Sequence, residues 1–471
     1  MERKGLGAIM LSLALAVAPA VKADTIAAAL TDAYNNSGLL DQNRALLRAA
    51  DEDLAQAVAT TRPIINWSMG ATSTRSRTTS DASTLHRATA GISGSLPLYT
   101  GGSNRLAIEA QKETILGTRQ SLRAVEQDVL FRAVQAYMNV RRDTEFLSLR
   151  QNNVRVITQE FRAAQDRFDV GEVTRTDVSL AEARLAAARS LLAAAQGNLA
   201  QSVEEFRTAV GRMPSGLAPV SPAPASRSEA EAKAFAVRNH PVILETQHAV
   251  AAAELTIRRA EAALGPSLSL EGSISTSNSW GDTGPVDLSR DFDDRTRSQQ
   301  AQIGISAGGP IYNGGRLSSQ IRQLMSNRDA TRAGLHVAAL GIEQQVGNAY
   351  ASLVVARASR VASNQQIRAA QVAFDGVREE ATLGARTTLD VLNAEQELLD
   401  ARANSISAQA DEVIASYALL AAVGLLTVDH LNLPVQQYDP SSYYNLAKNA
   451  PVVHSSQGQA LDRVLRAIGH E

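Results

Sequence analysis

The chain contains an internal repeat whose two copies align at a constant offset, and this duplication limits its fold more than any other feature. Adding 213 to a position in the first half recovers identical residues in the second half, from Pro97 to Gly211, with no insertion or deletion. Loops tolerate insertions, whereas one extra residue in a long helix turns every following side chain by about 100°. The sequence therefore predicts long, closely packed helices that occur twice. The matching pairs include Pro97 and Pro310, Tyr99 and Tyr312, Gly171 and Gly384, and Asp177 and Asp390.

Upstream of Pro97 the offset between the copies is 203, so the second copy has ten extra residues, which fall within 276–297. Insertions are accommodated at exposed tips, so each copy is expected to have one variable loop. Residues 282–294 are acidic, and either a solvated loop or a site for a divalent cation is consistent with this composition. The carboxylates in question are Asp287, Asp291, Asp293 and Asp294.

The N-terminal residues have the pattern of an export signal. Two basic residues precede an apolar run from Leu6 to Val17, and cleavage is expected after Ala23, with Ala20 as the alternative. The chain has no cysteine, which excludes disulfides, a zinc-thiolate site, a cysteine nucleophile and a lipidated N-terminal cysteine. No run of eighteen apolar residues follows the signal, so the exported chain is expected to dissolve or to enter a membrane as strands. The formal net charge of −2 does not indicate nucleic-acid binding.

Four short segments interrupt the helical pattern and alternate apolar with polar residues. Each has about the ten residues that a tilted strand needs to cross a bilayer. Half-buried hairpins of a soluble domain are the alternative. Four strands cannot close a barrel, and lipid does not tolerate an open edge, so the chain is expected to oligomerise. Two copies would give eight strands and no pore, whereas a homotrimer gives a twelve-stranded barrel with a channel. The segments are 65–72, 89–98, 267–275 and 301–311.

Helices are expected almost everywhere else. The fold class is therefore an α+β membrane protein, in which long antiparallel helical hairpins extend from four transmembrane strands per protomer. The expected helices are 25–62, 103–168, 174–210, 229–264, 316–381 and 387–423. The expected domains are a signal peptide at 1–23, a first repeat at 24–211, a Pro-rich linker at 212–228, a second repeat at 229–430 and a C-terminal tail at 431–471.

Each copy has a distinctive turn between its two longest helices. Gly171 and Gly384 can adopt the left-handed conformation that ends a helix. Thr174 lies three residues before Asp177, the spacing of a capping box, and the second copy repeats this spacing at Asp390. Helix capping is therefore one interpretation of both aspartates. In a trimer, three copies of Asp390 would also converge on the axis and make a constriction selective for cations.

With these features the chain resembles the TolC family of outer-membrane export ducts. The resemblance covers about residues 24–430, and the turn motifs at 170–178 and 383–394 are its most specific part. It implies that the turns are periplasmic tips that form a gate, in which Arg386 helps to clamp the closed tips and Thr176 is its hydrogen-bonding neighbour.

Two departures from the family pattern are expected to weaken this gate. Asn393 occupies the position of a second acidic ring, and Ala381 occupies the position of an aromatic clamp residue. A weaker latch and a lower affinity for cations should follow. The tail, with Tyr438-Asp439-Pro440 and Tyr443-Tyr444, is similar to that of alphaproteobacterial members.

The resemblance implies a homotrimeric channel in the cell outer membrane, in contact with its lipid, with a periplasmic tunnel. It would be the exit duct of a tripartite system for type I secretion or drug efflux, working with a periplasmic adaptor and an inner-membrane ABC or RND transporter. The absence of a lipid-anchor cysteine favours secretion. No cofactor, metal or catalytic activity is expected.

Two other functions are compatible with parts of the sequence. A soluble periplasmic coiled-coil adaptor would also contain long helical hairpins. An esterase is suggested by the G-x-S-x-G spelling at 304–308, but that motif requires Ser306 at a sharp strand-to-helix turn, and here it falls within an expected strand.

Overall fold

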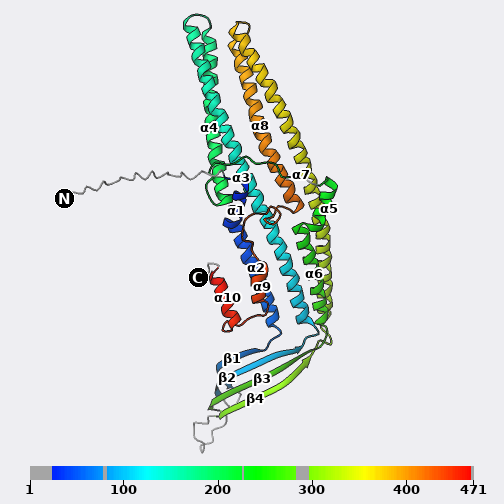
Figure 1. Ribbon diagram of the computed structural model, residues 1–471. Coiled ribbons are helices and arrows are strands. Elements are labelled where there is room, and N and C mark those ends of the chain that lie inside the picture. Colours follow the sequence, from blue (N-terminus) through cyan, green and yellow to red (C-terminus); the bar gives the residue numbers. More distant parts are fainter. Residues whose placement is uncertain (1–23, 78–81, 225–226, 283–295, 468–471) are drawn as a thin grey trace, which may run out of the picture.

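Long helices extend from one side of a small sheet, and the same order of elements occurs twice along the chain (Figure 1). The computed structural model describes residues 24–77, 82–224, 227–282 and 296–467. The expected signal peptide and the four aspartates at 287–294 lie outside the described residues. The first set of elements is α1 (Ile26–Asn36), α2 (Gly38–Ala59), β1 (Ile64–Arg77), β2 (Ala82–Tyr99), α3 (Ser103–Asp169) and α4 (Arg175–Val210). The second is α5 (Glu229–Asn239), α6 (Pro241–Ala262), β3 (Ser267–Asp282), β4 (Thr296–Gly308), α7 (Arg316–Thr382) and α8 (Thr388–Val423).

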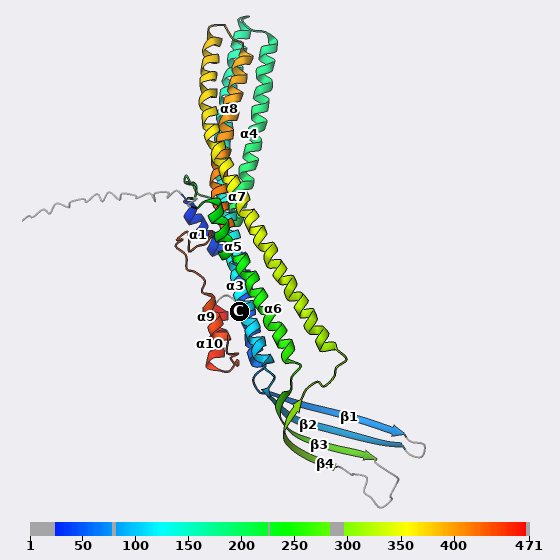
Figure 2. The same ribbon diagram turned by 90° about the vertical axis from the view of Figure 1, so that its right-hand side faces the viewer.

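The four long helices match their predicted bounds to within one residue at either end. Helices α3 and α7 contain 67 residues each, which corresponds to about 100 Å at 1.5 Å per residue. Helix α4 returns along α3, and α8 returns along α7, so that two antiparallel hairpins lie side by side (Figures 1 and 2). The prediction of long antiparallel helical hairpins is confirmed.

The helices that precede each strand pair are each broken once, which the sequence analysis did not predict. Ser37 separates α1 from α2, and its hydroxyl accepts a hydrogen bond from the amide of Leu40 at 3.3 Å. His240 separates α5 from α6, because Pro241 lacks an amide hydrogen and begins a new helix at its first position. The prediction of one continuous helix at 25–62 and another at 229–264 was therefore wrong, because each region forms two helices.

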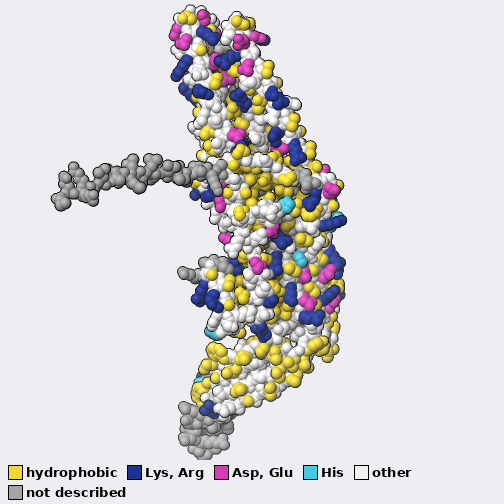
Figure 3. Space-filling view, in the orientation of Figure 1, with side chains coloured by type: hydrophobic (Ala, Val, Ile, Leu, Met, Phe, Trp, Pro, Cys, Tyr) yellow, Lys and Arg dark blue, Asp and Glu magenta, His cyan; other side chains and the backbone are white. Residues whose placement is uncertain are grey.

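The four strands form one antiparallel sheet in the order β1-β2-β3-β4. Trp67 is aligned with Ile92, and Ile92 with Ile274, so an apolar row crosses three neighbouring strands. Adjacent positions form a polar row, in which Ser273 pairs with Gln302. Figure 3 shows hydrophobic side chains gathered over the sheet, whereas charged side chains lie mostly along the helices. The predicted alternation of an apolar and a polar face is confirmed.

The strands are longer than predicted, with 14, 18, 16 and 13 residues in chain order, although β4 ends at Gly308 and the predicted end at residue 311 was wrong. The added residues in β1 and β2 are mostly Ser, Thr and Arg, and they lie at the ends farthest from the helices. Ser306 lies within β4 and pairs with Ser269, which excludes the strand-to-helix turn that an esterase would need. Strands β1 and β4 have no neighbour on their outer edges within the described protomer.

Two cores hold the helices together where both hairpins meet α1 and α5. In the first, Leu130, Val134 and Tyr137 of α3 pack against Phe206 of α4, and all four side chains are buried. In the second, Val346 and Leu353 of α7 pack against Leu419 of α8. Leu, Val and Ala dominate both cores, and the small alanines allow the helices to approach closely.

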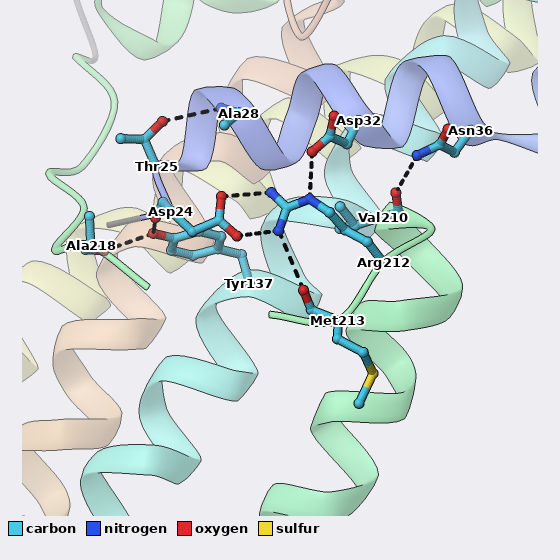
Figure 4. A network of polar contacts seen from close by, with 10 residues as sticks. All are labelled: Asp24, Thr25, Ala28, Asp32, Asn36, Tyr137, Val210, Arg212, Met213 and Ala218. Atoms are coloured by element: carbon cyan, nitrogen blue, oxygen red, sulfur yellow. Dashed lines mark hydrogen bonds and ion pairs between the residues drawn. The ribbon is translucent and has the colours of Figure 1, made fainter. Parts of the chain in front are cut away.

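An ion-pair network fixes the start of the described chain to the segment between α4 and α5 (Figure 4). Arg212 donates to both carboxylate oxygens of Asp24, at 2.5 and 2.7 Å, and its Nε donates to Asp32 at 2.6 Å. The hydroxyl of Tyr137 shares its one proton between the carbonyls of Asp24 and Ala218, which lie at 2.6 and 2.9 Å. Burial raises the pKa of Tyr137 to about 12, so the phenol remains a donor. This part of the expected linker is therefore anchored to the helices.

One described helix, α8, is long and apolar enough to cross a membrane by length and composition. The helix has no unbroken apolar run of eighteen residues, so the sequence did not predict it as a membrane span. More than half of the qualifying window, 56%, is buried within the protein, against α3, α5 and α7. Its apolar character is therefore explained by packing inside the helical body.

The C-terminal tail forms two further helices, α9 (Pro440–Ala447) and α10 (Ser456–Ala467), which the sequence analysis did not predict. Helix α9 packs against α2, where the hydroxyl of Tyr443 donates to Glu52 at 2.8 Å. Leu461 of α10 packs in turn against Tyr443 and Ala447. The tail therefore lies along the outside of α2, and both helices lie close to the sheet (Figure 1).

Candidate functional site

The two hairpin turns lie together at the end of the molecule farthest from the sheet (Figure 1). Gly171 and Gly384 have φ angles of 82° and 78°, the left-handed region that favours glycine. The amide of Gly171 donates to the carbonyl of Phe168, and the amide of Gly384 donates to that of Ala381. Both glycines therefore end their helices in the way that the sequence predicted.

The threonine and aspartate after each glycine form a complete capping box. Asp177 Oδ2 accepts from the amide of Thr174 at 2.9 Å, and the amide of Asp177 donates to the hydroxyl of Thr174 at 3.4 Å. Asp390 and Thr387 repeat this geometry at 3.0 and 3.3 Å. These hydrogen bonds lower the pKa of both carboxyls, so both aspartates remain charged at neutral pH. The predicted capping role is confirmed in both copies.

Arg386 forms an ion pair within its own hairpin. Its Nε donates to Glu380 at 2.8 Å, and both side chains are about half exposed. Glu380, and more weakly Asp390, raise the pKa of the guanidinium. Thr176 is exposed on the first turn of α4, in the other hairpin. The clamp between Arg386 and Thr176 stays a prediction.

Asn393 connects the two hairpins within one protomer. Its side-chain oxygen accepts a hydrogen bond from Arg184 of α4 at 3.1 Å. One residue earlier, Leu392 is 2% exposed and packs against Ile157 and Leu185 of the first hairpin. Asn393 therefore contributes to a contact between α4 and α8.

Glu395 is a buried carboxyl in the same contact, and its role was not predicted from the sequence. It is 8% exposed, and its Oε1 accepts from the side-chain amide of Asn153 at 3.4 Å. Its Oε2 has no partner among the described residues. Burial and the nearby Glu160 raise the pKa of Glu395 to about 7, against the weaker effects of Asn153 and Arg378.

The only sequence signal at Glu395 is its identity with the equivalent residue of the first repeat. It is identical to Glu182 in the first copy, but Glu182 is exposed. The two equivalent positions therefore have different surroundings. Helix α8 packs against α3 of the other hairpin, whereas α4 has no comparable packing against α7 among the described residues.

The tips thus combine exposed charges with a mixed polar and apolar contact between hairpins. Within the ranges described above, no group of three or more His, Asp or Glu side chains has the arrangement of a metal site. Turns of this kind can present fixed carboxylates and cations to a passing ion or to a partner protein.

Comparison with known proteins relates the whole arrangement to one family. The family described as outer membrane efflux protein matches residues 29–212 and 235–425. The chain is 37% identical to the outer membrane efflux protein BepC of Brucella suis biovar 1, over 94% of each chain. It is 26% identical to the outer membrane protein TolC of Vibrio cholerae serotype O1, over 87% of this chain and 92% of that relative.

A solved structure shares the fold at low sequence identity. The CmeC outer membrane channel of Campylobacter jejuni aligns with a TM-score of 0.73 at 15% identity, covering 91% of this chain and 90% of that chain.

Proposed function

Because the chain belongs to the outer membrane efflux protein family, we propose that it is the exit duct of a tripartite export system, gated at its helix tips. The protein is an outer-membrane efflux channel with a periplasmic tunnel, and its family is one of transport channels rather than of enzymes. The alternative of a soluble adaptor therefore does not hold. The repeats at 24–211 and 229–430, joined by 212–228, would be its two building units.

A homotrimer is proposed because the four-stranded sheet has two open edges. Strands β1 and β4 lie at opposite edges and run in opposite directions, so β4 of one copy can pair with β1 of the next. Such pairing would satisfy the backbone groups that lipid leaves without partners. Exposed side chains on the apolar face support its contact with lipid, including Trp67 at 76% and Ile303 at 80%. Three copies would close a barrel of twelve strands.

The gate is proposed to consist of the residues at the tips. In a trimer, Asp390 would line the narrowest point three times, while Arg386, Thr176 and Asp177 would connect neighbouring hairpins. Asn393 would lower the charge of this constriction relative to a tip with two acidic rings. The capping geometry supports this proposal, because it holds each carboxylate ionised and in a fixed position.

The export system would need two partners, since the proposed duct supplies no energy. A periplasmic adaptor would bind the exposed helical tips, and an inner-membrane ABC or RND transporter would drive transport. Type I protein secretion and drug efflux both suit this duct.

The test is single-channel conductance in a planar bilayer, comparing the mature protein with Asp390→Asn. Asparagine can still accept the hydrogen bond from Thr387, so this change removes the charge and keeps the cap. We expect small cation-selective pores in the wild type and a selectivity that falls several-fold in the variant.

The matched control is Asp177→Asn, which alters the equivalent capping box of the first repeat. A smaller effect at Asp177 is expected, because only Asp390 is proposed to converge on the axis. Equal selectivity in all three proteins would limit both aspartates to helix capping. A failure of the folded protein to form pores would contradict the proposed duct itself.

A further inference from the structure

The loop between α9 and α10 lies beside the start of the first membrane strand. Arg62 is two residues before β1, and its guanidinium donates to the carbonyl of Ala450 at 2.6 Å and also to that of Asn449. The loop is therefore at the level at which the chain leaves the helices and enters the sheet. Figure 2 shows the same arrangement, with the lower ends of α9 and α10 close to the base of β1.

This loop, residues 450–455, is a defined turn. Ala450 has a φ of 43°, unusual for a residue other than glycine. The amide and hydroxyl of Ser455 both donate to the carbonyl of Val452, at 2.8 and 2.6 Å. The amide of Gly458 donates to the hydroxyl of Ser455 at 3.0 Å. A Cβ at Gly458 would lie only 2.2 Å from the carbonyl oxygen of Val452, so the turn requires glycine there.

The turn presents two apolar side chains to the outside. Val452 and Val453 are 67% and 64% exposed, although α9 and α10 bury Tyr443 and Leu461 in their own small core. A turn held by its own hydrogen bonds does not need valines to be stable. Two exposed valines are too few to define a large apolar patch, so their position beside the apolar face of the sheet carries the argument.

Lipid is the covering phase that the position favours. The side chains that mark the near edge of the apolar sheet face are also exposed, with Leu98 at 48% and Tyr99 at 55%. Aromatic side chains such as Tyr99 are typical of the membrane interface, which places this edge of the sheet, and the loop at its level, near that boundary. Lys448, at the end of α9, adds a cation next to the loop that suits lipid phosphates.

We propose that the loop at 450–455 is a membrane-interface anchor, in which Val452 and Val453 insert into the periplasmic leaflet of the outer membrane. The tail then contacts lipid beside the barrel as well as packing along α2. Each trimer would carry three such contacts outside its barrel wall. Burial of two valines contributes a modest affinity, which adds to the insertion of the strands.

The test uses the absence of cysteine in the natural chain, so that one introduced thiol is the only site for a label. Val453→Cys is labelled with an environment-sensitive fluorophore, and the protein is reconstituted into vesicles with or without brominated phospholipid. Ile303→Cys, on the apolar face of β4, serves as the lipid-exposed standard. Quenching of its label by brominated lipid shows that the protein has inserted under the conditions used for the other variants. Val372→Cys, which is 73% exposed on α7, is the matched control far from the sheet.

We expect brominated lipid to reduce the fluorescence at Val453 by about half, as at a shallow interfacial site, and to leave Val372 unchanged. Quenching at Val453 no greater than at Val372 would overturn the proposal. Protection of the Val453 label from an aqueous quencher by an added adaptor protein, but not by lipid, would also overturn it and identify a protein surface instead.

Discussion

At the scale of single residues, Glu395 shows most clearly what the fold adds to the sequence. A glutamate in a helix usually faces water, and its equivalent Glu182 does so. Glu395 is buried because Leu392 and its neighbours draw α8 against α3, and Asn153 supplies only one hydrogen bond. The sequence could reveal the capping boxes, which depend on local spacing, but not a carboxyl buried by a contact between distant helices.

The raised pKa of Glu395 predicts that the contact between the hairpins weakens with rising pH. The folded protein holds a proton on Glu395 up to about pH 7, whereas the unfolded chain loses it near the ordinary glutamate value of 4.5. Stability from this group is therefore full below pH 4.5 and is lost as the pH rises to about 7. Glu395→Gln should remove this dependence and stabilise the protein at pH 8 by about 1–3 kcal/mol per chain.

Thermal unfolding between pH 5 and 8 measures the effect of Glu395. The control is Glu182→Gln, which changes the same residue of the first repeat at an exposed position and should leave the pH profile unaltered. Parallel profiles for the wild type and Glu395→Gln would show that the carboxyl is ionised throughout this range.

Arg212 should contribute to stability through the carboxylate that it covers. Asp24 is 6% exposed, and without the guanidinium its charge would remain buried beside Tyr137. Arg212→Met should therefore cost about 2–4 kcal/mol in the free energy of unfolding. Arg212→Lys keeps the charge but cannot bond both oxygens of Asp24 while also reaching Asp32. Its free energy of unfolding should therefore lie between those of the wild type and Arg212→Met. Chemical denaturation of the three proteins checks this order, and equal stabilities would contradict it.

At the scale of elements, helices and strands differed in how well the sequence predicted their bounds. Helices α4 and α8 each begin after a capping threonine and end before a glycine, and these signals are local. The break at His240 also had a local signal in Pro241, whereas the break at Ser37 is marked only by a weaker capping residue. Strand β2 begins at Ala82 rather than at 89, because its first part pairs through the backbone and has no apolar face to reveal it.

The two faces of the sheet should respond differently to a charge. Ile303 and Gln302 are neighbours in β4, but Ile303 belongs to the apolar face and Gln302 to the polar face. Ile303→Arg should cost about 2–4 kcal/mol on insertion, since the charge would face hydrocarbon, whereas Gln302→Arg should be tolerated in the barrel interior. The amount of assembled protein can be measured for both variants by its heat-modified mobility in gel electrophoresis. We expect this amount to fall only for Ile303→Arg. Equal loss would mean that the faces have been assigned wrongly.

At the scale of the whole molecule, the duplication predicted the architecture better than any motif did. A constant register implies rigid, packed helices and therefore two helical hairpins, whereas the four strands followed from the alternation of apolar and polar residues. The relative placement of the two hairpins did not follow, because it depends on contacts such as Arg184 with Asn393. The tail was also missed, since α9 and α10 have no counterpart in the repeats and gain their stability from α2 and from each other.

The pairing of β2 with β3 has an evolutionary consequence. This seam joins the second strand of one repeat to the first strand of the next, and a seam between β4 and β1 of adjacent chains would join the same two kinds of strand. A ring of three chains is then a ring of six nearly equivalent units, in which every second junction is covalent. An ancestral chain of a single repeat would close the same ring with six copies. Fusion of two such copies would free each to diverge, which is consistent with the burial of Glu395 and the exposure of Glu182.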